Sequence, residues 1–206
     1  MKQKIAEEKS ALGRPSRVTQ GSGLAASLPA GLLDACRNGE RESVRVLFEL
    51  YQDSVFSLAL NFSGDRSLAR DVCQNVFLKL ISGLHALRSE ENFRPWLCRL
   101  VVNACMDEHR RTRKLVASDE AKLYALDSAT SPEDAAQRQQ VGLEVRSAVT
   151  RLSPRLRLPI LLRYVEGLSY EEIAGVLGCS MGTVASRLSR GHRALARRLS
   201  HLRGII

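Results

Sequence analysis

Residues 169–188, SYEEIAGVLGCSMGTVASRL, predict two helices that meet across a tight turn. Ser169 with Glu172 three residues later forms a capping box, which is typical of the start of a helix. Gly178 stands where the first helix would end, and Ser180 can cap the second helix. This arrangement is typical of a helix-turn-helix.

The second helix of this pair continues into a basic run. Its apolar residues recur at helical spacing and predict a buried stripe: Val184, Leu188, Gly191, Leu195, Leu199 and Leu202. At roughly 100° per residue, the opposite face carries small or cationic side chains: Gly182, Ser186, Ser189, Arg190, Arg193 and Arg197. No Asp or Glu occurs between residues 186 and 202, whereas a solvated helix normally mixes charge signs. The face therefore favours a polyanion over the alternative of a solvated amphipathic surface.

The composition also favours a polyanionic partner. The chain has 206 residues, a formal charge of +9 and a pI near 9.8. Excess Lys and Arg suits nucleic acid, because neutralised phosphates release counterions. Membrane surfaces are the competing acidic partner, but no stretch approaches the ~20 apolar residues that span a bilayer. The first residues also lack the apolar core of a secretory signal. We expect a cytoplasmic protein without membrane insertion.

The cysteines and histidines show no spacing typical of a metal site or a disulfide framework. The five cysteines include no C-x-x-C pair, and the four histidines are not paired with them. We expect no catalytic residues, no cofactor and no metal. Two alternatives stay open, namely a thiol catalyst and redox sensing through Cys36, Cys73 or Cys98.

The apolar periodicity predicts an all-α protein with two small helical domains joined by a flexible acidic linker. We expect a disordered tail at 1–27, a first domain at 28–114, a linker at 115–131 and a second domain at 132–206. Helices are expected near 29–38, 41–62, 67–83, 92–114, 132–151, 154–166, 169–178 and 181–202. The helices at 41–62 and 67–83 each show a broad apolar face, which includes Phe48 in the first, and Val72, Val76, Phe77, Leu80 and Ile81 in the second.

The expected linker is acidic in a basic protein. Between residues 115 and 136 a single lysine accompanies five acids: Asp119, Glu120, Asp127, Glu133 and Asp134. Ser131 and Ser153, each followed by proline, are expected to begin the helices at 132–151 and 154–166.

Residues 92–114, NFRPWLCRLVVNACMDEHRRTRK, predict a helix that can face both a core and a nucleic acid. Phe93 and Trp96 can stack on exposed bases, while the basic end of the helix holds phosphates. In the alternative interpretation Trp96 is a core residue and the basic end only complements the helix dipole.

Two pairs of motifs resemble one family. Residues 69–80, ARDVCQNVFLKL, with residues 93–103 resemble region 2 of the extracytoplasmic-function sigma factors of bacterial RNA polymerase. Residues 152–188 resemble region 4 of the same family. The resemblance implies a subunit that binds core polymerase, carries it to promoters and helps to open the duplex, without covalent chemistry of its own.

The resemblance also implies the site residues. Polymerase binding through the clamp would use Asp71, Gln74, Asn75 and Lys79, with further contact to the flap. Recognition of the minus-10 element would use Arg88, Asn92, Phe93, Trp96, Arg99, Asn103, Arg110 and Arg111. Recognition of the minus-35 element would use Thr183, Ser186, Arg187, Ser189, Arg190 and Arg193. Promoter DNA and an anti-sigma factor are the other implied partners.

Two alternatives concern the organisation of the chain. A free-standing helix-turn-helix repressor or activator that dimerises on a palindrome would explain residues 150–202, but not the first domain. The family resemblance also implies that the linker follows the path of nascent RNA through the polymerase, and the alternative is a solvated tether.

Overall fold

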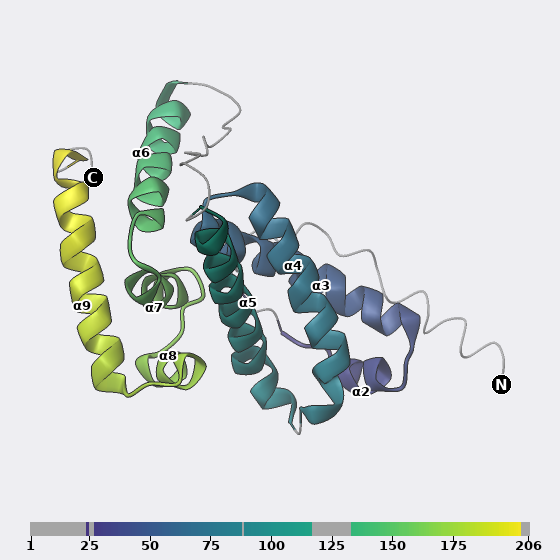
Figure 1. Ribbon diagram of the computed structural model, residues 1–206. Coiled ribbons are helices and arrows are strands. Elements are labelled where there is room, and N and C mark those ends of the chain that lie inside the picture. Colours follow the sequence, from purple (N-terminus) through teal and green to yellow (C-terminus); the bar gives the residue numbers. More distant parts are fainter. Residues whose placement is uncertain (1–23, 25–26, 88, 117–132, 203–206) are drawn as a thin grey trace, which may run out of the picture.

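The computed structural model describes Leu24 and residues 27–87, 89–116 and 133–202 (Figure 1). The α-helices of this part are α2 (Leu32–Arg37), α3 (Arg41–Ser63), α4 (Arg66–Gly83), α5 (Phe93–Val116), α6 (Glu133–Thr150), α7 (Pro154–Tyr164), α8 (Tyr170–Leu177) and α9 (Met181–Arg198). Short 3-10 helices are η1 (Leu84–Ala86), η2 (Glu90–Asn92) and η3 (Ser200–Leu202). The described residues contain no strand, so the all-α prediction is confirmed.

Most of the predicted helices have the expected bounds, and three are shorter. The helix predicted at 29–38 begins only at Leu32, because Gly31 has a φ of 75°, in the left-handed region. The helix predicted at 154–166 ends at Tyr164, where the chain turns toward Gly167 with a φ of 68°. The helix predicted at 181–202 ends at Arg198 and is followed by η3. Nearly all of the expected tail and linker lies outside the described residues, so both stay predictions.

Helices α2 to α5 form the first helical unit. α3 and α4 pack along each other, and α5 packs against both. Gly64, with a φ of 75°, ends α3. The Asp65 carboxylate then accepts the N–H groups of Ser67 and Leu68 at 2.6 and 3.0 Å and caps α4. This short connection makes α3 and α4 an antiparallel hairpin.

Helices α6 to α9 form the second unit, in which α7 is the most buried helix. Leu158, Ile160, Leu161 and Leu162 are all at most 5% exposed. The expected start of α7 is confirmed, but the Ser153 side chain makes no capping hydrogen bond. Pro154 at the first position, with its fixed φ and lack of an N–H, suits the helix start instead.

The helix-turn-helix is formed as predicted by α8 and α9. The Ser169 hydroxyl accepts the Glu172 N–H at 3.1 Å, and the Glu172 carboxylate accepts the Ser169 N–H at 2.7 Å. Gly178 has a φ of 61°, and Ser180 accepts the Thr183 N–H at 3.2 Å. Val184, Leu188, Gly191 and Leu202 of the expected stripe are buried.

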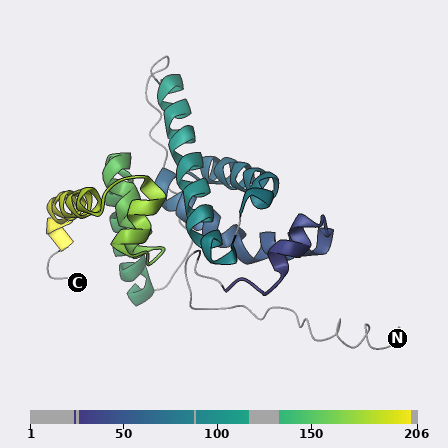
Figure 2. The ribbon, with the colours of Figure 1, turned by 90° about the horizontal axis from the view of Figure 1, so that it is seen from below.

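The two units pack directly against each other. Helix α5 contacts α8, and α3 contacts both α6 and α7. In Figure 1 α7 and α8 lie between α5 and α9, and Figure 2 shows α9 at the outer edge of the second unit. The outer face of α9 therefore points away from the first unit. Helix α5 of the first unit, in contrast, lies directly beside the second unit.

The apolar faces of α3 and α4 are only partly committed to the core. Val72, Val76 and Leu80 are at most 2% exposed, as expected. Phe48 and Ile81 were expected on buried faces, but they are 41% and 46% exposed. The Phe48 ring lies 4.6 Å from that of Phe77, and both residues line a groove between α3 and α4 together with Ile81.

We predict that Gly83→Ala destabilises the protein by ~1–3 kcal/mol, because overpacking a close contact forces a shift of the neighbours. A Cβ at Gly83 would lie 2.8 Å from Cζ2 of Trp96. Trp96 is the only tryptophan, so its fluorescence in urea unfolding reports both the local change and the free energy of unfolding. Gly142→Ala in α6 is the matched control, because its Cβ would meet nothing within 4 Å. The control should be neutral or stabilising by up to ~1 kcal/mol. Equal effects of the two variants would contradict the steric argument.

Candidate nucleic-acid interface

The outer face of α9 is exposed and positively charged. Ser186, Ser189, Arg190, Arg193 and Arg197 are all exposed, and α9 contains no acidic residue. The Arg190 guanidinium donates to the Ser186 carbonyl at 3.2 Å and to the Ser186 hydroxyl at 3.3 Å. These bonds hold Arg190 along the helix surface, beside the small side chains of Ser186 and Ser189.

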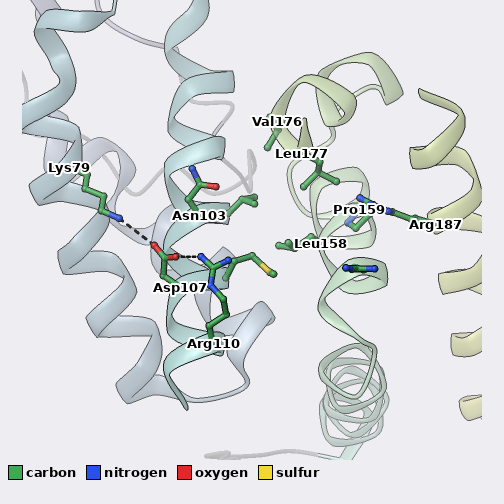
Figure 3. Close-up of a pocket in the computed structure, with 12 residues that line it drawn as sticks. Lys79, Asn103, Asp107, Arg110, Leu158, Pro159, Val176, Leu177 and Arg187 are labelled. Atoms are coloured by element: carbon green, nitrogen blue, oxygen red, sulfur yellow. Dashed lines mark hydrogen bonds and ion pairs between the residues drawn. The ribbon is translucent and has the colours of Figure 1, made fainter. Parts of the chain in front are cut away.

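Two of the minus-35 candidates lie beside this face rather than on it. Thr183 is half-buried at the start of α9, with its hydroxyl 3.0 Å from the Ser180 hydroxyl. Arg187 is also half-buried and donates to the Cys179 sulfur at 3.8 Å. In Figure 3 the Arg187 side chain extends from α9 toward Pro159, so it lines the space between the two units. Arg187 borders the buried stripe of α9. The helical period alone does not show that its side chain is half-buried while the other arginines are exposed.

Most of the minus-10 candidates on α5 and before it are accessible side chains. Asn92, Arg99, Asn103, Arg110 and Arg111 are exposed. Arg110 pairs with Asp107, and Arg111 lies 3.6 Å from the Glu108 carboxylate. These acids compensate part of the basic end of α5. Arg88 lies outside the described residues.

Phe93 was predicted to stack on DNA bases, and in this structure its ring lies in the core of the first unit. Phe93 is 2% exposed, and its ring lies 5.2 Å from that of Tyr51. An aromatic residue beside arginines suits either a core or a base, and the Tyr51 contact decides for the core here. Trp96 is half-buried and lies 6.1 Å from the Phe93 ring. This position is consistent with the core interpretation for part of the Trp96 side chain, since its Cζ2 lies against Gly83.

A cleft of about 490 Å³ lies between the two units. Figure 3 shows Lys79, Asn103, Asp107 and Arg110 on one side, facing residues of α7, α8 and α9. Lys79 lies 3.6 Å from Asp107. The Lys79 ammonium therefore faces α5, one helical turn after Asn75 on α4.

Arginines bridge the two units around this cleft. Arg99 donates to the Gly175 carbonyl at 2.6 Å, and Arg94 donates to the Glu166 carbonyl at 2.5 Å. The Arg94 guanidinium also lies 3.7 Å from the Glu172 carboxylate. Bonding to the Ser169 N–H lowers the pKa of Glu172, which keeps its charge available to Arg94. These contacts were not predicted, because their partners lie more than 70 residues away in the sequence.

A third arginine that bridges the two units is Arg157, which is only 7% exposed. It donates to the carbonyls of Phe62, Thr150 and Leu152, and its guanidinium lies 5.0 Å from the centre of the Phe62 ring. Burial lowers its pKa to about 10, so the group stays protonated at neutral pH. Arg157 thus joins α7 to the end of α3 through the protein interior.

The polymerase candidates Asp71, Gln74 and Asn75 are exposed on α4. Gln74 also lines an apolar groove of about 440 Å³ between α3 and α4. The groove includes the exposed Phe48, Leu78 and Ile81, of which Leu78 is 60% exposed. The sequence analysis assigned no role to Leu78. Its position as an apolar residue between the polymerase candidates Asn75 and Lys79 was an available signal for an apolar contact at this surface.

Comparison with known proteins assigns the chain to a family. Residues 47–115 match Sigma-70 region 2, and residues 142–195 match Sigma-70, region 4. The chain is 31% identical over 180 residues to the RNA polymerase sigma-H factor of Pseudomonas aeruginosa, covering 83% of this chain and 93% of that protein. It is also 31% identical to the ECF RNA polymerase sigma-E factor of Escherichia coli K12, over 83% of this chain and 94% of that protein. This chain belongs to the extracytoplasmic-function sigma factors.

Solved structures show the same fold. One is the sigma factor RpoE of Bartonella quintana in complex with the anti-sigma factor NepR, with a TM-score of 0.61 and 24% identity over 76% of this chain and 96% of that chain. Another is CnrH in complex with the cytosolic domain of CnrY, with a TM-score of 0.61 and 22% identity over 82% of this chain and 96% of that chain. The two helical units of this sigma factor thus occur together in solved relatives.

The cysteines of this sigma factor do not favour thiol chemistry. Burial raises the pKa of Cys98 to about 12 and that of Cys105 to about 12, whereas a nucleophilic thiol needs a lowered value. Burial also raises the pKa of Cys36 and of Cys73. In the part of the chain that the structure describes, no group of three or more His, Cys, Asp or Glu residues is placed to hold a metal ion. Within the same residues no helix is long and apolar enough to cross a membrane.

We predict that Arg157→Ala lowers the free energy of unfolding by ~3 kcal/mol, because buried carbonyls that lose their donor are costly. Thermal and urea unfolding followed by circular dichroism will measure the change. Arg155→Ala is the matched control, since Arg155 lies on the same helix with an exposed side chain. The control should stay within ~0.5 kcal/mol of the wild-type protein. A similar small effect for Arg157→Ala would show that the buried contacts carry little stability.

Proposed function

We propose that this sigma factor directs core RNA polymerase to promoters and initiates transcription, with α9 on the minus-35 element, α5 on the minus-10 element and α4 on the polymerase. The observation that carries the proposal is the outer face of α9, which combines small side chains with exposed arginines and lacks acids. The major groove admits such a helix, and arginine reads guanine or holds phosphate there. The factor itself makes no covalent bond, and it acts in the cytoplasm, where the polymerase is.

The minus-10 contacts are proposed for the exposed side of α5 and the segment before it. Asn92, Arg99 and Asn103 offer donors and acceptors to an extruded base, whose pairing edge can then be read. Arg110 and Arg111 follow toward the end of the helix, where they hold phosphates. Phe93 supports this surface from the core, and the half-buried Trp96 offers the part of its side chain that is accessible.

Polymerase binding is proposed for Asp71, Gln74 and Asn75 together with the adjacent apolar groove. An exposed apolar patch with a polar rim is typical of a protein interface. We place the clamp of the polymerase here and its flap on the second unit. An anti-sigma factor is the further partner proposed, as in the two solved relatives named above.

Run-off transcription with core polymerase on a random promoter library tests the proposal and selects the promoter sequence. Initiation that depends on this chain, with a common sequence among the selected templates, is the expected result. Absence of initiation with active core polymerase would contradict the proposal.

We predict that Arg190→Ala weakens binding to the selected promoter by ~1–3 kcal/mol if Arg190 reads a base. If Arg190 holds phosphate, binding should weaken nearly equally on all sequences, with a smaller salt dependence. Binding of the polymerase holoenzyme to labelled promoter DNA at several salt concentrations separates the two cases. Arg146→Ala on α6 is the control, because it removes the same charge from an exposed helix outside this face. Unchanged binding for Arg190→Ala would remove it from the interface.

We predict that Asp71→Lys reduces affinity for core polymerase at least ~10-fold without unfolding the protein, because like charges juxtaposed at an interface cost several kcal/mol. Asp71 is exposed, while Val72 beside it is buried, so the change leaves the core intact. Fluorescence anisotropy of labelled protein titrated with core polymerase measures the affinity. Glu42→Lys on α3 makes the same charge change at another exposed position and should bind normally. Normal affinity for Asp71→Lys, or loss of its helical circular dichroism, would contradict the prediction.

A further inference from the structure

The segment between α4 and α5 joins the two helices that we assign to polymerase binding and to the minus-10 element. It contains η1 and η2. Leu84 and Leu87 are 1% and 8% exposed, and Phe93 at the start of α5 is 2% exposed. Between Leu87 and Phe93 the side chain of Asn92 is exposed. Buried side chains therefore anchor both ends of the segment, while its middle is open to a partner.

One arginine from outside the segment holds its first part. Arg37, the last residue of α2, donates from Nε to the Leu84 carbonyl at 3.1 Å and from one terminal nitrogen to the Leu87 carbonyl at 2.7 Å. Its other terminal nitrogen donates to the Asp34 carboxylate at 2.5 Å. All three guanidinium nitrogens thus have a partner, and the planar group fixes their relative geometry. In Figure 1 α2 lies beside the lower end of α4, where η1 begins.

These two bonds decide where the rest of the segment starts. The carbonyls of Leu84 and Leu87 follow α4 directly, and carbonyls at a helix end lack partners within the helix. The backbone of Leu87 and Ser89 is extended, and the Ser89 hydroxyl then accepts the Glu91 N–H at 3.3 Å and caps η2. The Asn92 N–H donates to the Ser89 carbonyl at 3.2 Å. The place of Asn92 therefore follows from where Leu87 is held.

Arg37 differs from a typical surface arginine of this protein. Arg45 on α3 pairs with Glu42 and Glu49 of its own helix, and exposed pairs of this kind contribute little to stability. The Arg37 side chain is only 21% exposed. Its carbonyl partners lie 47 and 50 residues away, on the segment that leads into α5. Loss of Arg37 would therefore release a connecting segment rather than a helix.

We propose that Arg37 is a positioning residue for minus-10 recognition. Through the carbonyls of Leu84 and Leu87 it sets the place of η2, so that Asn92 meets an extruded base at a fixed position. Arg37 acts through these carbonyls and does not itself contact DNA. A binding group must be held within ~0.5 Å of its productive position, which is why a distant anchor of the segment matters. This inference rests on the proposed function of α5 and of the segment before it.

Promoter discrimination by the polymerase holoenzyme tests the proposal. The position that Asn92 reads is found first, as the minus-10 position whose base preference Asn92→Ala abolishes on the random promoter library. At that position Arg37→Ala should lower the preference for the selected base at least ~5-fold, because a misplaced reading group loses much of its effect. Absence of any position that depends on Asn92 would overturn the inference.

Two further variants serve as controls for this measurement. Arg37→Lys keeps the charge but lacks the planar group that reaches both carbonyls, so its base preference should lie between those of Arg37→Ala and wild type. Arg41→Ala removes an exposed arginine at the start of α3 and should keep the wild-type preference. A wild-type preference in folded Arg37→Ala would overturn the inference. Should Arg37→Ala fail to fold, a wild-type preference in Arg37→Lys would overturn it.

A double-mutant cycle asks whether Arg37 acts through the segment. In the Asn92→Ala background, Arg37→Ala should change the preference at the same position less than ~2-fold, because the group that it positions is gone. Binding to a duplex that carries only the minus-35 element should stay within ~2-fold of wild type, since α9 lies far from Arg37. Full additivity of the two substitutions would contradict the proposed positioning.

Amide hydrogen exchange of the free protein separates this inference from the proposed function. The N–H groups of Leu87, Glu91 and Asn92 are hydrogen-bonded within the segment, and their exchange should accelerate severalfold in Arg37→Ala. The Ile173 N–H in the second unit is the internal control and should exchange as in wild type. Equal exchange in folded Arg37→Ala and wild type would overturn the inference alone. If the wild-type factor supports no initiation, the proposed function fails, whatever the exchange shows.

Discussion

The buried guanidinium of Arg157 is the interaction on which the arrangement of the two units depends. A charge removed from water is costly unless hydrogen bonds satisfy it. Here the donors reach carbonyls near the ends of two helices, Phe62 of α3 and Thr150 of α6. A cation at the C-terminal end of a helix is favourable to the helix dipole, and Arg157 serves two such ends at once. The Phe62 ring covers the remaining face of the guanidinium.

Sequence reasoning was most reliable where structure follows from neighbouring residues. The capping box at Ser169, the turn at Gly178 and the stripe from Val184 are all local patterns, and the structure has each of them. Arg157 was not recognised, because in the run PRLRLPILLR it has the same local pattern as its exposed neighbour Arg155. Its partner Phe62 lies 95 residues away, and no period in the sequence connects them. Long-range contacts of this kind need the fold before they can be seen.

The same reason explains the mixed outcome for the candidate site. The exposed face of α9 follows from helical geometry alone, so Ser186, Ser189 and Arg190 lie where they were expected. Phe93 and Lys79 depend on which helix packs beside them. Tyr51 draws Phe93 into the core, and Asp107 draws Lys79 to α5. A residue type therefore indicates a chemistry, while the neighbouring helix decides whether that chemistry is presented to a partner.

The raised pKa values of Cys98 and Cys105 have a consequence for oxidative stress. At so high a pKa the thiolate, which is the form that peroxide attacks, is scarce at neutral pH. Both side chains are also at most 1% exposed, so an oxidant must await local unfolding to reach them. These two cysteines act as small apolar packing residues in α5. A peroxide signal that reaches this factor through its own chemistry would have to enter elsewhere in the chain, and α5 would keep its shape while the signal passes.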